Sequence, residues 1–299
     1  MNSAHAIFNI RDLENISGIK AHTIRIWEKR YNILQPERTD TNIRLYTIEN
    51  LKRLLNITLL HHHGYKISKI ATFDEDKLKV MIGDIISPKT VRHHAISAFK
   101  MAMLQFDQDY FLQTYNELLS EKSFREIFND IFIPLLNEIG MLWQTETVSA
   151  VHEHFISSLL RQKISANIEK AQRETPTLGE RTFVFYLPLH ENHELGLLYM
   201  HYEAVLNGCK TIYLGPGIQI DDLDRLGPHI ANPVFVTYFT LDPERDTLQA
   251  YFSEFGSKLL DGTTSELWVG GSQVVDVPDQ QYHKSISIIH SFTDYIRKL

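Results

Sequence analysis

The stretch Phe183-Val-Phe-Tyr-Leu187, with the polar loop Glu191-Asn-His-Glu-Leu-Gly196 behind it, decides the fold of the C-terminal part of the chain. The apolar run has the composition of a buried strand, and Leu197 to Leu206 has the spacing of a helix. A strand, a loop and a helix in this order are typical of a parallel α/β sheet. Ligands of such sheets bind at the carboxyl ends of the strands, and this loop falls there.

Three residues of the loop have binding chemistry. His193 can offer a neutral imidazole nitrogen to a metal, and Glu191 can accept the proton on the other ring nitrogen, which makes the imidazole a better ligand. Gly196 lets a bulky group approach the backbone. The Glu-x-His-x-x-Gly match is short, so on these residues alone a histidine of an exposed loop explains the pattern as well as a ligand does.

The composition is that of a globular protein of two or three domains, with 299 residues of which 43% are hydrophobic and 22% charged. Cys209 is the single cysteine, which excludes an internal disulfide and a zinc site built from cysteines. Residues 1–13 lack a basic flank before an apolar core, and no window has the roughly 18 apolar residues of a membrane span. We expect a cytoplasmic protein without a membrane segment.

Charge is unevenly distributed along the chain. Residues 1–70 contain eleven Lys and Arg against six Asp and Glu, a net charge of +5, whereas the whole chain carries -7 and the remainder therefore -12. A basic N-terminal part on an acidic body predicts a nucleic-acid-binding head.

Residues 1–73 have the pattern of a winged helix-turn-helix. A short helix near Phe8 to Leu13 leads into a Gly-containing turn at Ile16 to Ile19, and Ala21 to Tyr31 forms the second helix. The polar loop Thr39 to Asn42 separates two segments that we expect to pair as a wing. Further helices are expected at Thr47 to His62 and from Lys66. The candidates for contact with phosphates or base edges are Thr23, Arg25, Lys29, Arg30, Arg38, Arg44 and Tyr46.

These residues resemble the head of the MerR family of transcription regulators, which carries a Thr-Ile-Arg helix, a Pro-x-Arg entry to the wing and an Arg-x-Tyr exit. The matching segments are Thr23-Ile-Arg25, Pro36-Glu-Arg38 and Arg44-Leu-Tyr46. The resemblance implies a double-stranded DNA operator as partner. Metal-sensing members use cysteine thiolates beyond the head, and a chain with one distant cysteine does not match them.

Other residues of the head have a simpler interpretation. We expect Trp27 to pack in the core of the head rather than to contact DNA. The run His61-His-His63 suggests a metal site at first sight. Neighbouring residues of a helix face in different directions, however, so three consecutive histidines do not converge on one ion.

Residues 74–175 are expected to form a four-helix bundle. Asp74 to Ser87 has the charge of a linker, and Pro88 marks a break. Asp107 and Ser123 stand at expected helix starts. Four segments have apolar residues at three- and four-residue spacing. They are Val91 to Gln105, Asp107 to Ser120, Phe124 to Trp143 and Val148 to Ala171.

Residues 180–299 alternate strand and helix patterns, which predicts a doubly wound parallel sheet. The expected strands are Phe183 to Leu187, Lys210 to Leu214, Val234 to Phe239, Leu267 to Val269 and Ser285 to Ile289. The expected helices are Leu195 to Leu206, Asp221 to His229, Arg245 to Leu260 and Phe292 to Lys298. The Gly-rich fingerprint of nicotinamide cofactors does not follow the first strand.

This part resembles instead the cobalamin-binding domain, whose signature is Asp/Glu-x-His-x-x-Gly after the first strand, Ser-x-Leu after the third and Gly-Gly after the fourth. The first element is Glu191-x-His193-x-x-Gly196, and the last is Gly270-Gly271. The middle element departs from the signature, because Thr237-Tyr-Phe239 keeps the hydroxyl but replaces Leu with Phe.

The bundle carries a second resemblance, to the cap of cobalamin-binding MerR regulators of the light-responsive CarH/LitR type. Trp143, nine intervening residues and Glu153-His154 match its motif. Taken by itself, Trp143 would be assigned to the bundle core and Glu153-His154 to solvent. The resemblance implies that all three line the upper face of the corrin. In some light-responsive members a histidine follows this Trp and captures cobalt after photolysis. Here Gln144 stands in that position, and His152 and His154 are nearby alternatives.

The two resemblances together imply a repressor that binds adenosylcobalamin. The benzimidazole tail of the cofactor would enter the sheet cleft beside Gly196, Gly270 and Gly271, and His193 would replace it as the lower ligand of cobalt. Visible light breaks the bond between cobalt and the upper group, which would change the assembly of a dimer or tetramer.

Two alternatives stay open on the sequence. In the first, the regulator binds cobalamin but does not respond to light, and a protein partner controls it. In the second, the chain is an enzyme that carries cobalamin. A carrier needs no winged head, and a substrate-binding barrel of roughly 250 residues is not present, so we expect a regulator that is not an enzyme.

Overall fold

The computed structural model describes residues 7–84, 88–226, 229–230, 232–277 and 282–299. The chain divides into two compact units, Met1–Leu159 and Leu160–Leu299. Among the described residues, none of the helices is long and apolar enough to cross a membrane. The division into three domains at 1–73, 74–175 and 180–299 stays a prediction.

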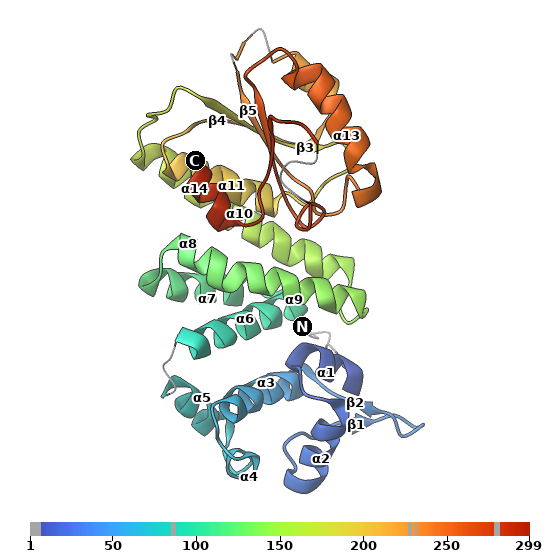
Figure 1. Ribbon diagram of the computed structural model, residues 1–299. Helices are drawn as coiled ribbons and strands as arrows, with labels where there is room; N and C mark the ends of the chain where they lie inside the picture. The colour runs from blue at the N-terminus through green and yellow to red at the C-terminus, as the bar shows by residue number, and fades with distance from the viewer. Residues whose placement is uncertain (1–6, 85–87, 227–228, 231, 278–281) are drawn as a thin grey trace. The chain divides into compact units, whose positions relative to one another are not determined.

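The first part of unit one is a helix-turn-helix with a small wing (Figure 1). The side chain of Asn9 accepts the backbone N–H of Arg11 and of Asp12, and the Asp12 carboxylate accepts the N–H of Asn9, so the first helix begins with a capping box. The wing strands pair antiparallel, with Glu37 opposite Leu45. The elements are α1 (Ile10–Ser17), α2 (Ala21–Tyr31), β1 (Glu37–Arg38), β2 (Arg44–Leu45), α3 (Ile48–His62) and α4 (Ile67–Ile70).

The predicted linker from Asp74 to Ser87 is wrong over most of its length, because Glu75–Gly83 forms a helix, α5. Asp74 caps that helix by accepting the N–H of Lys77 at 2.8 Å. Leu78 is buried, and the Glu75 carboxylate lies 2.6 Å from a guanidinium nitrogen of Arg53 in α3. The charges that suggest a linker therefore cap the helix and dock it on α3. Residues 85–87 of the predicted linker lie outside the described residues.

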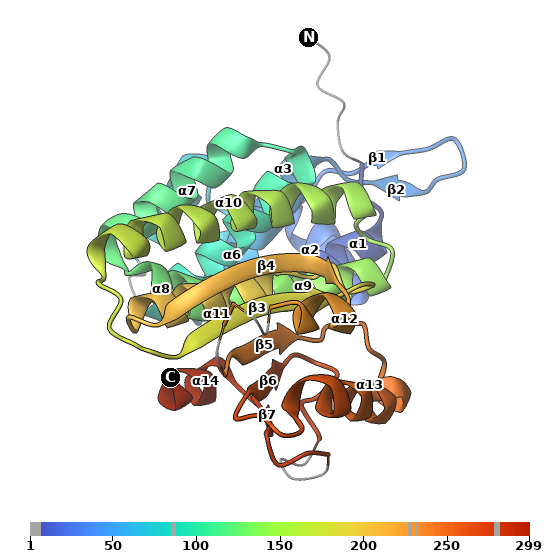
Figure 2. The same ribbon diagram turned by 90° about the horizontal axis from the view of Figure 1, so that it is seen from above.

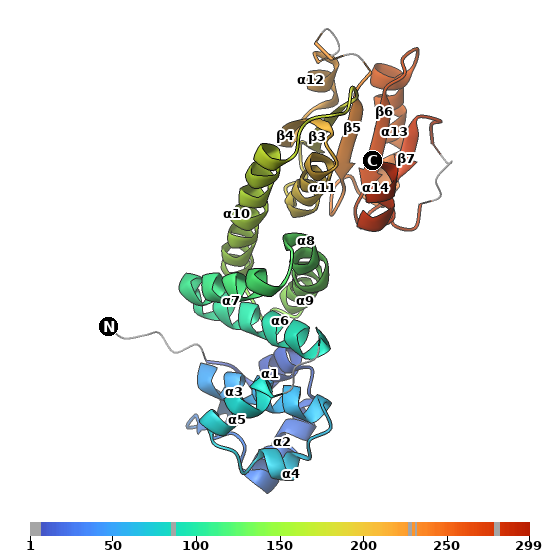
Figure 3. The ribbon, with the colours of Figure 1, turned by 90° about the vertical axis from the view of Figure 1, so that its left-hand side faces the viewer.

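The bundle helices follow the predicted segments. Asp107 and Ser123 act as N-caps, as expected from the sequence. The third segment is interrupted by a π-helical turn at Phe128–Phe132, and Figure 3 shows α7 running beside α6. Phe99, Phe111 and Phe132 form an aromatic centre, with ring centroids 4.9 and 5.7 Å from that of Phe99. The elements are α6 (Pro88–Gln105), α7 (Gln108–Glu121), α8 (Phe124–Ile127), α9 (Ile133–Gln144) and α10 (Ala150–Glu174).

Unit two contains a five-stranded parallel sheet in the order β4-β3-β5-β6-β7, and Figure 2 shows these strands side by side. Its strands are β3 (Thr182–Pro188), β4 (Lys210–Ile218), β5 (Val234–Tyr238), β6 (Glu266–Gly270) and β7 (Ile286–Ile288). The helices are α11 (Leu195–Leu206), α12 (Ile220–Asp224), α13 (Leu248–Phe255) and α14 (Phe292–Lys298). The predicted α and α/β architecture is confirmed.

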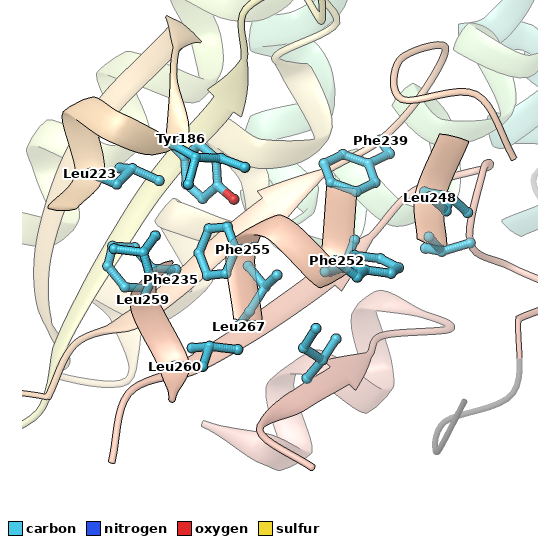
Figure 4. Packing of buried hydrophobic residues seen from close by; sticks show 14 of the residues in the cluster. Tyr186, Leu223, Phe235, Phe239, Leu248, Phe252, Phe255, Leu259, Leu260 and Leu267 are labelled. Atoms are coloured by element: carbon cyan, nitrogen blue, oxygen red, sulfur yellow. The ribbon is translucent and has the colours of Figure 1, made fainter. Parts of the chain in front are cut away.

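Alternating residues of the strands supply an apolar layer on each face of the sheet. Phe185 of β3 packs with α11 and α14, whereas Val184 and Tyr186 pack with α12 and α13. Figure 4 shows the second layer, in which Tyr186 lies among Phe235, Phe239 and Phe255. The two apolar layers hold the strands in place, so that the carboxyl ends of β3, β5 and β6 lie at the same end of the sheet.

Candidate functional sites

The loop between β3 and α11 is organised by Glu191, whose side chain is fully buried. Its Oε1 accepts the backbone N–H of His193 at 2.8 Å and lies 2.7 Å from Nδ1 of the same histidine. The predicted pairing of Glu191 with the His193 ring is confirmed. Because a carboxylate only accepts hydrogen bonds, Nδ1 carries the ring proton, and Nε2 is the atom with the lone pair that a metal needs.

The second oxygen of Glu191 holds another loop. Oε2 accepts the backbone N–H groups of Thr240, Leu241 and Asp242, at 2.8, 2.7 and 3.1 Å. Burial opposes ionisation of the carboxyl, but the hydrogen bonds from His193 and from these amides outweigh it and lower the pKa of Glu191 to about 2. One carboxylate therefore fixes the loops that follow β3 and β5.

His193 has the exposure that a ligand residue needs. Its side chain is 49% exposed although Glu191 beneath it is not exposed at all. The donor set of a neutral imidazole oriented by a buried carboxylate is suited to cobalt. The role of His193 as lower ligand remains our proposal.

Thr237 lies at the end of β5 and is fully buried. Its hydroxyl lies beside the phenol of Tyr186, in the apolar layer on the α12 and α13 side of the sheet. The contact with Tyr186 accounts for the buried hydroxyl, and a role of Thr237 in cofactor binding stays a prediction.

The glycines of the candidate site border filled space. A Cβ on Gly196 would lie 2.6 Å from the ring of Tyr238, and one on Gly270 would lie 3.1 Å from it. Gly271 has a φ of 110° and closely approaches the backbone of Phe239. The Glu191–His193 pair thus fits the metal of a corrinoid, whereas the expected tail cleft is occupied by the chain's own Tyr238.

The cap residues belong to unit one. Trp143, near the end of α9, is 46% exposed, so the alternative that it fills the bundle core is wrong. On α10, Glu153 is half-buried and accepts the Ser157 hydroxyl at 2.7 Å, and His154 is exposed. Exposure makes Trp143 and His154 available to a ligand, but their contact with one remains a proposal.

Three of the four arginines proposed to contact DNA are exposed. Arg25 and Arg30 lie on α2, and the Arg30 guanidinium is 5.6 Å from the ring centroid of Tyr31. Arg38 lies on the wing and donates to the side-chain carbonyl of Asn42. Thr23 is half-buried near the start of α2, which begins after Lys20. Arg25, Arg30 and Arg38 are thus accessible to phosphates.

Tyr46 requires a correction. It is fully buried and donates its hydroxyl to Glu28 at 2.9 Å, so it cannot touch a duplex directly. The half-buried Arg44 donates to the same carboxylate at 3.0 Å, which places both residues in a support for the wing. Arg44 keeps its proposed role because its side chain is 33% exposed. Trp27 is buried, as expected.

Sequence reasoning does not single out Lys100, which the structure places at a junction. The side chain is almost fully buried in α6, and its Nζ donates to the backbone carbonyl of Ile16 at 3.0 Å and to Glu138 at 2.7 Å. The only signal in the sequence is a lysine inside an apolar segment. Lys100 links the last turn of α1 to α6 and α9.

Two family models match the chain. Residues 8–77 match the MerR HTH family regulatory protein, and residues 95–166 match the B12 binding domain. Together they confirm the resemblance to a MerR-type head followed by a B12-binding segment.

Two relatives extend the match beyond these segments. The HTH-type transcriptional repressor CarH of Myxococcus xanthus is 25% identical over 280 residues, which cover 90% of each chain. The HTH-type transcriptional repressor CarA of the same organism is 23% identical over 69% of this chain and 67% of its own. Both relatives are named as transcriptional repressors.

A solved structure supports the fold. The monomethylamine corrinoid protein of Methanosarcina barkeri superposes with a TM-score of 0.58 at 8% identity, covering 71% of this chain and 98% of that one. At this identity the likeness shows the fold alone.

The low pKa of Glu191 predicts how the stability of the fold depends on pH. Its value of about 2, below the ordinary 4.5, means that ionised Glu191 stabilises the fold above pH 4.5 and that this contribution is lost as the pH falls toward 2. Glu191→Gln cannot accept the same set of N–H groups and should lose about 1–3 kcal/mol near neutral pH. We expect the variant to show a shallower loss of stability between these pH values in urea titrations. An identical pH profile in both proteins would contradict this assignment.

Proposed function

We propose that this chain, which joins a MerR-type head to a B12-binding domain, is a transcriptional repressor that binds adenosylcobalamin and releases DNA in light. The observation that carries the proposal is the Glu191–His193 pair, an oriented imidazole at the carboxyl edge of the sheet. The match of residues 95–166 to the B12 binding domain supports it independently.

His193 would hold the cofactor by offering Nε2 to cobalt. Glu191 keeps the proton on Nδ1 and makes the imidazole a stronger donor. Thr237 is assigned to the cofactor from the resemblance at the end of β5 alone. The bound cofactor would supply a bond between cobalt and carbon that visible light breaks. The proposed binding edge is the end of the sheet where β3, β5 and β6 finish, and it includes Gly196, Gly270 and Gly271.

We assign Trp143, Glu153 and His154 to the upper face of the corrin. An exposed indole gives a large adenosyl group an apolar surface, and loss of that group would remove the contact. The dark and light arrangements would then differ in free energy by this contact, which gives the population shift a physical cause.

We propose that the heads of two chains bind two DNA half-sites as a dimer. Two such dimers would form the tetramer that is present in darkness. Two-fold symmetric heads match pseudo-palindromic operators, which is how helix-turn-helix proteins gain affinity. Arg25, Arg30, Arg38 and Arg44 would contact the duplex, with Thr23 at the start of the same helix.

Gln144 favours a second candidate function, a regulator that binds cobalamin without responding to light and is controlled by a protein partner. An amide is a weaker ligand for cobalt than imidazole, so Gln144 would not capture cobalt after loss of the upper group. Of the two nearby histidines, His152 bonds to Ser149 at 2.9 Å and stacks on Phe106, whereas His154 is exposed. Under the first proposal, in which light removes the upper group, His154 is therefore better placed than His152 to ligate cobalt in place of Gln144.

Substitution of His193 tests cobalamin binding. His193→Ala should lose most of its cobalamin during gel filtration because cobalt loses its protein ligand. His190→Ala, an exposed histidine of the same loop, is the matched control and should retain the cofactor. The visible spectrum of the eluted protein gives the result. Equal retention and equal spectra in both variants would show that His193 is not the lower ligand.

The exposed arginines make a prediction about DNA binding. Arg25→Ala and Arg38→Ala should each weaken binding to an operator fragment selected from random duplexes. Each should also reduce the slope of log affinity against log salt by about one, because one phosphate contact is lost. Fluorescence anisotropy at several salt concentrations measures the slope. Lys170→Ala, an exposed basic residue of α10, is the control and should leave it unchanged. Wild-type slopes in both arginine variants would place the DNA surface elsewhere.

A further inference from the structure

Tyr238, the last residue of β5, fills the space between two glycines of the binding edge. Its ring lies so close to Gly196, in the first turn of α11, that a Cβ there would be 2.6 Å from it. On the opposite side the corresponding distance from Gly270, at the end of β6, is 3.1 Å. Both distances from such a Cβ to the ring are shorter than an ordinary van der Waals contact. Only glycine therefore leaves room for the ring at these two positions, and the two glycines form a cradle for it.

The ring is also held from a third direction. Phe292 of α14 stacks on it with the centroids 5.9 Å apart and the planes inclined by 5°. Offset stacking of this kind is attractive, although a single pair contributes little beside the whole core. Tyr238 remains half-buried rather than fully buried. The ring therefore lies at the border of the apolar layer formed with α11 and α14.

We propose that Tyr238 is a specificity-determining residue that competes with the nucleotide tail of cobalamin for the cradle formed by Gly196 and Gly270. This inference rests on the proposed function, because it takes the tail to enter beside these glycines. Two groups cannot occupy the same space, so tail entry requires the ring to give up its contacts with the glycines and with Phe292. A corrinoid without a nucleotide tail meets no such obstacle.

The competition predicts selectivity between two ligands with the same metal ring. Cobinamide, which lacks the nucleotide, would bind through His193 alone and leave Tyr238 in place. Cobalamin would bind with an added cost from displacing the ring. The ratio of the two affinities therefore reports the role of Tyr238, while contributions common to both ligands cancel.

Titration of the full-length protein with hydroxocobalamin and with aquacyanocobinamide tests the proposal. Tyr238→Ala should raise the ratio of cobalamin to cobinamide affinity by about tenfold or more. Tyr238→Phe is the matched control, because it keeps the ring and should keep the wild-type ratio. Visible absorbance gives both affinities, and circular dichroism checks folding. If Tyr238→Ala does not fold, Phe292→Ala removes the stacking partner and should shift the ratio in the same direction.

The outcomes separate this inference from the proposed function. If wild type and Tyr238→Ala bind both corrinoids with the same ratio, the tail does not compete with Tyr238, and the inference is overturned while corrinoid binding stands. If neither protein binds either corrinoid, the proposed function fails and the inference fails with it. An equal gain for both ligands would show general loosening of the site and would also overturn the inference.

Discussion

The buried carboxylate of Glu191 is the interaction on which the binding edge of the sheet depends. It gathers five hydrogen bonds, two from His193 and three from the backbone of residues 240–242. Hydrogen bonds to a buried charge are stronger than neutral ones, and each amide left without an acceptor would cost free energy. The same charge that joins two loops thus sets the tautomer of His193, so the geometry of the edge and its metal chemistry have one source.

A second polar link acts inside unit one. Lys100 joins the carbonyl of Ile16 in α1 to Glu138 in α9, and the Asn15 amide donates to the Thr147 hydroxyl at 2.8 Å. A pocket of about 860 Å³ is lined by residues of these elements. Lys100 therefore connects α9, which also carries Trp143, with the last turn of α1 through polar contacts. This supplies a physical connection between the proposed cap and the helix-turn-helix.

Periodicity predicts the elements whose burial it reflects. The expected bounds of α11 and α14 coincide with those observed, because each helix covers the sheet with apolar residues at regular spacing. The helix α5 was not predicted, since its charges serve as a cap and as a partner for Arg53 rather than as a solvated linker. Helix α13 is preceded by a short 3-10 turn and followed by a π-helical turn within the predicted segment.

The candidate site shows where sequence reasoning stops. Glu191 and His193 are two residues apart, so their pairing follows from local geometry and could be predicted. Tyr238 meets Gly196 and Gly270 only because three separate elements converge, and no local pattern records that convergence. Tyr46 illustrates the same limit, because its polar end is used by Glu28, which lies far from it in sequence.

The affinity of the full-length protein for an operator fragment shows whether the upper ligand of cobalt controls DNA binding. It should be measured without cofactor, with adenosylcobalamin in darkness, and with the same sample after illumination. With adenosylcobalamin we expect tight binding in darkness and a loss of affinity of about tenfold or more after illumination, equivalent to roughly 1.4 kcal/mol or more. Hydroxocobalamin should give the affinity of the illuminated sample from the start. Equal affinity under all conditions would contradict a repressor switched by the upper ligand.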